Sequence, residues 1–329
     1  AVERLSLAIA HRGPDGEGIE QRESHGRSVI LVHRRLAIID LSDAGAQPMT
    51  DATTGNIVTF NGEIYNYRAL RAELEARGCD FRSQSDTEVI LQAYAQWGPS
   101  CVERLRGMFA FALWDAHNER LMCAVDRFGI KPLYYVQSGE TFAAASEVRA
   151  LLNAGVAPRE LNPHACVEFF AYGSVQAPRT IMRDVYALLP AHILLYDVAS
   201  NTATTTEYWT PTARARTTTP RDIDLALKDT VRHHLVSDAP LGLFLSGGID
   251  SSALVVLTHR EELASVHAHT ISFEEANYAE GSIARQVGET VSLFSSYFES
   301  EAKKYGFKVY NTDEDFQNQL LEASSSLLS

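Results

Sequence analysis

A short run of small residues between two apolar segments constrains the second half of the chain more than any other feature. Leu241–Leu245 is rich in apolar residues and predicts a buried strand, Ser246–Ser252 predicts a tight loop, and Ser251–Leu257 predicts a helix. Gly247 and Gly248 allow backbone N–H groups to approach a ligand closely, and the helix N-terminus adds free donors and the positive end of its dipole. We therefore expect an anion site here, with phosphate as the obvious ligand.

The loop differs from the ordinary phosphate-binding loop of nucleotide hydrolases. That loop has four residues between its glycines and then Lys-Ser or Lys-Thr, and no lysine follows here. A loop that holds phosphates by backbone and hydroxyl donors suits an enzyme that releases pyrophosphate and leaves the nucleoside monophosphate on its substrate. A Gly-rich turn without a ligand is the alternative, but it gives no purpose to the hydroxyls and Asp250.

This loop resembles the signature loop of the ATP pyrophosphatase family. The resemblance implies ATP with Mg2+ as ligands, held by Leu245, Ser246, Gly247, Gly248, Asp250, Ser251, Ser252 and Phe273. Leu245 and Phe273 would contact adenosine through the backbone, although apolar strand ends also suit core packing. With a further strand expected over Val266–Phe273, the spacing predicts a parallel sheet that binds the nucleotide at the carboxyl ends of its strands. We predict no metal site built from protein ligands alone.

Composition excludes several classes of partner. The 329 residues include 29 Lys+Arg against 42 Asp+Glu, a formal net charge of −13, and no basic run gathers phosphates of a nucleic acid. No apolar stretch has the length of a membrane span, and the first residues lack the layout of a signal peptide. We expect a cytoplasmic protein that binds neither nucleic acid nor membrane. The four separated cysteines, Cys79, Cys101, Cys123 and Cys166, predict buried thiols rather than a zinc site or disulfides.

The first two-thirds of the chain predict short strands and helices in alternation. Helices are predicted over Val2–Ala10, after Asn66, and after Ser85, where Ser85-Asp-Thr-Glu88 fits a capping box. Strands are predicted at Val29–Val32, Asn56–Phe60, Met108–Trp114, Leu121–Val125, Leu133–Val136 and Thr141–Ala145. We expect antiparallel sheets with helices outside them.

Five segments of this region resemble successive landmarks of the class II glutamine amidotransferase domain. They are His11-Arg-Gly-Pro-Asp, Arg35-Leu-Ala-Ile, Asn61-Gly-Glu-Ile-Tyr-Asn, Ser85-Asp-Thr-Glu and Asp126-Arg-Phe-Gly-Ile-Lys-Pro-Leu-Tyr134. The resemblance implies an α+β domain of the N-terminal-nucleophile type, an αββα sandwich of antiparallel sheets, followed here by an incomplete α/β domain. The order of the two domains resembles the glutamine-hydrolysing asparagine synthetase family.

The same resemblance implies roles for individual residues. Arg35 would hold the α-carboxylate of glutamine, Asp86 its α-amino group, and Asn61 with Gly62 would form the oxyanion hole, while Ile38 and Glu63 complete the glutamine site. An arginine fork matches a carboxylate, and each oxyanion donor is worth roughly 3 kcal/mol in the transition state. Taken singly, Asp86 could merely favour its helix dipole, Arg35 could be a surface residue, and Asn61-Gly62 could be a plain turn.

The nucleophile used by the family has no counterpart in this sequence. It is a cysteine at the mature N-terminus whose α-amino group acts as the base, whereas this chain begins at Ala1, and its four cysteines are all internal. We expect an incomplete sequence that lacks the first strand and the nucleophile, and therefore no glutamine hydrolysis by the chain as given. A relative without glutaminase activity is the alternative.

We predict a glutamine amidotransferase domain at 1–205, a linker at 206–220 within a Thr-, Ala- and Arg-rich stretch that starts at Asn201, and a partial synthetase domain at 221–329. The family likeness ends near residue 287. The leading hypothesis is asparagine synthesis: ATP adenylates aspartate, pyrophosphate leaves, and ammonia from glutamine attacks the acyl-adenylate. Two further hypotheses stay open, namely an amidotransferase with another carboxylate acceptor and a non-catalytic remnant that binds glutamine or nucleotide. A homodimer also stays open.

Overall fold

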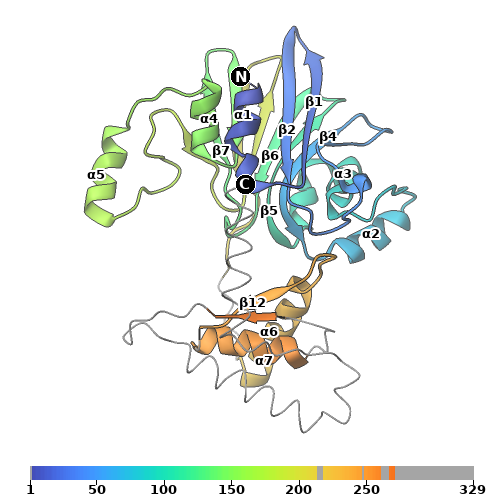
Figure 1. Ribbon diagram of the computed structural model, residues 1–329. Helices are drawn as coiled ribbons and strands as arrows, with labels where there is room; N and C mark the ends of the chain where they lie inside the picture. The colour runs from blue at the N-terminus through green and yellow to red at the C-terminus, as the bar shows by residue number, and fades with distance from the viewer. Residues whose placement is uncertain (1, 213–217, 247, 261–266, 271–329) are drawn as a thin grey trace, which may run out of the picture. The chain divides into compact units, whose positions relative to one another are not determined.

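The computed structural model describes residues 2–212, 218–246, 248–260 and 267–270 (Figure 1). The chain divides into two compact units, residues 1–214 and 215–329. None of the helices in the described ranges is long and apolar enough to cross a membrane.

The first unit contains three antiparallel sheets. A six-stranded sheet has the order β11-β10-β6-β5-β4-β3, a two-stranded sheet pairs β1 with β2, and a three-stranded sheet has the order β8-β7-β9. The strands are β1 (Gly16–Ser24), β2 (Arg27–Arg35), β3 (Met49–Thr50), β4 (Ile57–Ile64), β5 (Gly107–Asp115), β6 (Arg120–Val125), β7 (Tyr134–Ser138), β8 (Thr141–Ala145), β9 (Tyr186–Ala187), β10 (His192–Asp197) and β11 (Thr202–Glu207).

The first unit also contains α-helices. They are α1 (Val2–Ala8), α2 (Tyr67–Glu75), α3 (Asp86–Trp97), α4 (Val148–Ala154) and α5 (Pro163–Tyr172). Helix α3 packs on β4 of the large sheet, and α2 packs on α3 (Figure 1). Helices α1 and α4 pack together, and α1 contacts β2 while α4 contacts β8 of the smaller sheets. Because β2 also contacts β4, the sheets lie face to face between the helices. The predicted αββα sandwich is confirmed.

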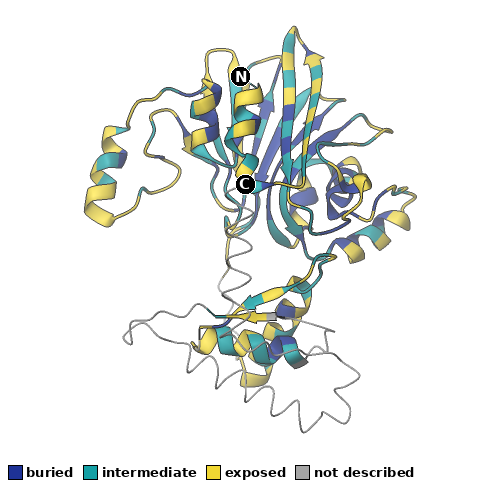
Figure 2. Cartoon of the chain, in the orientation of Figure 1, coloured by how far each residue is buried: buried dark blue, intermediate teal, exposed yellow. Residues whose placement is uncertain are grey.

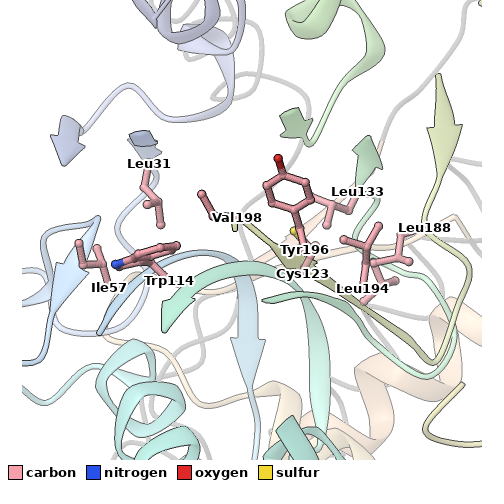
Figure 3. Packing of buried hydrophobic residues seen from close by; sticks show 11 residues of the cluster. Leu31, Ile57, Trp114, Cys123, Leu133, Leu188, Leu194, Tyr196 and Val198 are labelled. Carbon is pink, nitrogen blue, oxygen red and sulfur yellow. The ribbon is translucent and has the colours of Figure 1, made fainter. Parts of the chain in front are cut away.

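The main core lies between the facing sheets. Figure 3 shows Leu31 of β2 above Ile57 and Trp114 of the large sheet, beside a second group that includes Leu133, Leu194 and Tyr196. Strand β5 is apolar along most of its length because it is covered on both faces, whereas β1 alternates between partly buried and exposed residues (Figure 2). This packing fixes the ends of β2 and β4, where the candidate site lies.

The second unit contains α6 (Pro220–His234), β12 (Gly242–Phe244), α7 (Ile249–Arg260) and β13 (His267–His269). Thr219 opens α6 with a capping box, in which its hydroxyl accepts from the Asp222 N–H and the Asp222 carboxylate accepts from the Thr219 N–H. Strands β12 and β13 are parallel, with α7 between them in the chain. The predicted parallel arrangement of strand, loop, helix and strand is confirmed over these residues.

Several local predictions are wrong. Asn61 and Gly62 lie inside β4 rather than in a loop, because β4 pairs with β5 as far as Ile64. The stretch from Asn201 begins with β11, whose partner is β10, so the connection starts later than its composition indicates. Ser85 does cap α3, but Glu88 bonds the N–H groups of Arg82 and Ser83 instead of closing a capping box. Asn66 makes no cap hydrogen bond to α2, since its side chain bonds the backbone of residues 104 and 106.

Candidate functional site

The first unit encloses a cavity of about 390 Å³. Its walls come from the end of β2, the segment that follows it, the second half of β4, the start of α3, and parts of β5 and β8. All six residues predicted to hold glutamine line this cavity: Arg35, Ile38, Asn61, Gly62, Glu63 and Asp86. Residues that are far apart in sequence therefore share one space.

The Arg35 guanidinium is held in place by backbone carbonyls. Its Nη1 donates to the carbonyl oxygen of Ser42 at 2.8 Å, and its Nη2 donates to the carbonyl oxygen of Asp40. Gly45 leaves room for this arrangement, because a Cβ at that position would lie 2.7 Å from the Asp40 oxygen and 3.3 Å from Arg35 Cζ. A guanidinium has five N–H donors, so others remain to bind a carboxylate.

Asn61 brings an amide donor to the cavity wall. Its Nδ2 is buried and has no hydrogen-bond partner within the described residues. A buried donor without an acceptor costs about 1–3 kcal/mol, so such an atom marks a place where a ligand oxygen is expected. The next residue, Gly62, has φ of 151°, and a Cβ there would lie 2.7 Å from Phe109 Cα. Only glycine fits this point of contact between β4 and β5.

Asp86 is a buried carboxyl group at the first position of α3, with 4% of its surface exposed. Its Oδ2 accepts the Ile64 N–H at 2.9 Å. Burial raises the pKa of Asp86 to about 6; the nearby charge of Glu63 adds to this rise and the Ile64 N–H opposes it. A carboxylate in this position would gain from a cationic ligand.

Sequence reasoning missed some residues of the cavity, among them His33, Gln47 and Lys131. His33 Nδ1 lies 3.1 Å from the Thr59 hydroxyl, and burial together with the charge of Arg35 lowers the pKa of His33 to about 4. Gln47 joins two walls, since its Oε1 accepts the Phe60 N–H and its Nε2 donates to the Thr87 hydroxyl. Leu31 and His33 share the buried face of β2, and a histidine at this alternating position was the available signal for His33.

None of the four cysteines lines the cavity. Cys101 and Cys123 are buried elsewhere in the core, and burial raises the pKa of each thiol to about 12. Cys79 and Cys166 are partly exposed and lie outside the cavity lining. The cavity wall therefore presents arginine, amide and carboxylate groups and no cysteine thiol of this chain.

The second unit presents the loop between β12 and α7. The Ser246 and Ser251 hydroxyls are 3.1 Å apart, the Ser246 N–H donates to Ser251 Oγ at 3.3 Å, and the Gly248 N–H lies 3.4 Å from Ser246 Oγ. Ser246, Gly248 and Asp250 are exposed, while Ser252 is partly buried in the first turn of α7. Leu245 is buried and pairs with the neighbouring strand, its N–H donating to the His269 carbonyl at 2.8 Å. The predicted contacts at Gly247 and Phe273 lie outside the described residues.

Comparison with known proteins assigns the class. Residues 1–209 match the family described as glutamine amidotransferase domain, and the chain belongs to this family. Residues 222–299 match a second family, described as asparagine synthase.

Individual relatives extend over both regions. Asparagine synthetase [glutamine-hydrolyzing] 3 of Bacillus subtilis is 35% identical over 285 residues, which are 83% of this chain and 45% of the relative. Amidase chry2 of Gibberella zeae is 34% identical over 318 residues, 89% of this chain and 46% of the relative. A solved glutamine phosphoribosylpyrophosphate amidotransferase from B. subtilis covers 87% of this chain and 67% of its own at 15% identity, with a TM-score of 0.45. The chain spans about half the length of the curated relatives it matches.

Proposed function

We propose that this chain serves glutamine-dependent asparagine synthesis, with glutamine bound in the first unit and ATP at the loop of the second. The observation that carries the proposal is the meeting of Arg35, Asn61 and Asp86 in one cavity. These groups match the three polar ends of glutamine: a carboxylate, an amide oxygen and an ammonium. The matches with the amidotransferase and asparagine synthase families support the same reading.

Each group has a distinct chemical task in this proposal. Arg35 pairs with the α-carboxylate by charge-assisted hydrogen bonds, and Asp86 pairs with the α-ammonium. The buried Asn61 amide and the Gly62 backbone receive the amide oxygen, and they bind more strongly when that oxygen gains charge during attack at the carbonyl carbon. Ile38 and Glu63 complete the wall around the ligand.

Release of ammonia also requires a nucleophile. The family employs an N-terminal cysteine, and no cysteine of this chain lines the cavity. For the chain itself we therefore propose glutamine binding without hydrolysis. In a protein that supplies the cysteine, the same wall would orient the amide for attack.

The loop of the second unit fits a triphosphate. It combines exposed Ser246 and Gly248 with the N-terminus of a twelve-residue helix, which favours anions. When bound, ATP supplies the activating adenylyl group for a carboxylate, and Mg2+ would meet the phosphates beside Asp250. Ser246, Ser251 and the backbone of Gly248 would hold and orient the departing pyrophosphate. We propose aspartate as the acceptor and the cytoplasm as the compartment, as expected for amino-acid synthesis.

Calorimetry with L-glutamine tests the first half of the proposal. Arg35→Ala and Asp86→Ala should each weaken binding at least tenfold, since both remove ground-state ionic contacts, whereas Asn61→Ala should weaken it less. Arg183→Ala is the matched control, because Arg183 is exposed and outside the cavity. Equal losses in all three site variants would contradict the division of roles.

A different acceptor is the second candidate, favoured by the likeness to a relative that bears the name amidase rather than synthetase. ATP–pyrophosphate exchange in a protein that also holds the remainder of the synthetase domain separates the two. Exchange that depends on aspartate supports asparagine synthesis, and exchange with another carboxylate alone supports the second candidate. Formation of ADP and phosphate would show that the loop has been misread.

A further inference from the structure

Asp40 occupies an unusual position directly beside the cavity. It is 8% exposed and its backbone has φ of 53°, in the left-handed region that side chains other than glycine, Asn and Asp seldom adopt. It follows the end of β2 by five residues and does not itself line the cavity. Sequence reasoning gave it no role.

The two ends of Asp40 contact the two sides of the site. Its backbone carbonyl accepts a hydrogen bond from the Arg35 guanidinium. Through Oδ2 its side chain accepts a hydrogen bond from the Gln84 N–H at 2.8 Å, and Gln84 lies two residues before Asp86. Through Oδ1 it accepts the Ser42 N–H at 3.2 Å and the Ser42 hydroxyl at 2.5 Å, and the Ser42 carbonyl is the second acceptor for Arg35.

Asp40 therefore bonds the Arg35 guanidinium directly and the segment just before Asp86 through the Gln84 N–H. Burial opposes ionisation of Asp40, but the hydrogen bonds from Ser42 and Gln84 and the charge of Arg35 outweigh it, so the pKa of this carboxyl lies below its usual range. An ionised carboxylate at neutral pH accepts from several donors at once. A neutral amide in its place would turn a donor toward one of these N–H groups.

We propose that Asp40 is a positioning residue that fixes the Arg35 guanidinium relative to the start of α3 and thereby sets the site's selectivity for free α-amino acids. This inference rests on the proposed binding of glutamine by Arg35 and Asp86. In an α-amino acid the carboxylate and ammonium share one carbon, so their separation is constant. A site that binds both groups needs its arginine and its carboxylate at a fixed separation. Asp40 is bonded to the Arg35 guanidinium and to the Gln84 N–H just before Asp86.

Asp40→Asn is the informative variant, because Asn adopts the left-handed backbone as readily as Asp and keeps the shape of the side chain. Asp51→Asn is the matched control. Asp51 accepts the Thr53 and Thr54 N–H groups and the Thr54 hydroxyl in a similar turn, but it lies outside the cavity lining. Gly45→Ala is a second variant, since its methyl group would lie 2.7 Å from the Asp40 carbonyl oxygen and 3.3 Å from Arg35 Cζ. It would therefore disturb the contact between Asp40 and the Arg35 guanidinium while keeping the Asp40 side chain.

Two measurements on the full chain decide the matter. NMR of the guanidinium N–H groups, assigned through Arg35→Lys, should show slowly exchanging Arg35 signals in the parent and in Asp51→Asn but not in Asp40→Asn or Gly45→Ala. Calorimetry should show L-glutamine affinity reduced about tenfold in the last two variants, the loss expected for roughly one charge-assisted hydrogen bond. Thermal midpoints that match the Asp51→Asn control would separate this loss from general destabilisation.

The outcomes also separate this inference from the proposed function. A parent chain that binds no glutamine refutes the proposed function, and the Arg35 signals then decide the positioning role alone. Unchanged Arg35 signals in Asp40→Asn overturn that role. Where the parent binds glutamine, an Asp40→Asn affinity equal to that of Asp51→Asn overturns it as well. If Asp40→Asn does not fold, Gly45→Ala supplies the same two readings for the displaced guanidinium.

Discussion

At the scale of single residues, the site depends on groups that are kept away from water. Asp86 is 4% exposed, His33 is 9% exposed, and the Asn61 amide nitrogen is buried. Low polarity around such groups strengthens any interaction with a charged ligand and weakens their own ionisation. We therefore expect the affinity of the cavity for a charged ligand to depend on protonation.

Glutamine binding should depend on pH through Asp86. Since the pKa of Asp86 is raised to about 6 and only the carboxylate attracts an ammonium, affinity should fall roughly tenfold for each pH unit below this value. Calorimetry between pH 5 and 8 measures the slope, which Asp86→Asn should abolish. The pKa of His33 is lowered to about 4, so His33 stays neutral over this interval. A flat profile in the parent would contradict the role given to Asp86.

The same shift has a defined sign for stability. A carboxyl group whose pKa is higher in the folded than in the unfolded state holds its proton longer when folded, so its contribution to the free energy of unfolding decreases as pH rises from about 4 to about 6. A bound ammonium reverses this trend. Glutamine should therefore raise the thermal midpoint more at pH 7 than at pH 5.

Residue identities were the most predictable feature of the site. All six proposed glutamine residues line the cavity, and they were named because short motifs such as Asn-Gly-Glu and Ser-Asp-Thr-Glu resemble landmarks of the amidotransferase family. The supporting residues Asp40 and Gln47 were not predictable. Their importance comes from hydrogen bonds to segments far along the chain, and no local pattern records such contacts.

At the scale of elements, a buried polar network joins α3 to the hairpin of β5 and β6. Asp115 accepts from the Tyr94 hydroxyl at 2.7 Å, from Asn118 at 2.8 Å, and from Arg120 at 3.2 Å. Asp115 is 3% exposed, and Tyr94 lies on α3. The network holds the helix that presents Asp86 against the sheet that presents Asn61.

Asp115→Asn should lower the free energy of unfolding of the first unit by about 3 kcal/mol, because it leaves the partly buried Arg120 without its anion. The control is Asp197→Asn. Asp197 accepts a hydrogen bond from the Ser200 N–H in a comparable turn, but it is less buried than Asp115. Urea denaturation measures the free energy of unfolding of both variants.

Burial opposes ionisation of Asp115, but bonds from Tyr94, Asn118 and Arg120 keep its pKa below the usual range. The ionised Asp115 therefore stabilises the folded state at neutral pH, and this contribution is lost as pH falls through the lowered pKa of Asp115.

Element types were predicted better than element limits. The apolar strands β5, β6 and β8 appear where the sequence predicted them, whereas β4 was predicted to stop before Asn61. Asn, Gly and Glu are poor strand formers, and the continuation of β4 follows from its pairing with β5. Strand β11 is mostly threonine and was mistaken for a connection because its outer face is exposed.

At the scale of the whole molecule, the residues that line the candidate glutamine cavity all belong to the first unit. Its lining residues lie between Leu5 and Ser146. We predict that a chain ended after residue 214 binds L-glutamine as tightly as the full chain, as measured by calorimetry. More than a tenfold loss on this truncation would show that the second unit contributes to the cavity.

The chain as given should release no ammonia from glutamine at an enzymatic rate. No cysteine lines the cavity, and removal of a covalent nucleophile typically reduces turnover on the order of a million-fold. A coupled assay for glutamate measures the residual rate, with Cys79→Ser and Cys166→Ser as controls for the two partly exposed thiols. Turnover that disappears in either variant would contradict this account.

Strands β2 and β8 each pair on one side only within the described part of the chain. Both contribute to the cavity wall, β2 with Val32–Arg35 and β8 with Ala144 and Ala145. A strand edge with unused N–H and C=O groups is a template for any extended segment, whatever its side chains. We therefore expect the protein to self-associate increasingly as its concentration rises. Light scattering should accompany every titration made at high protein concentration.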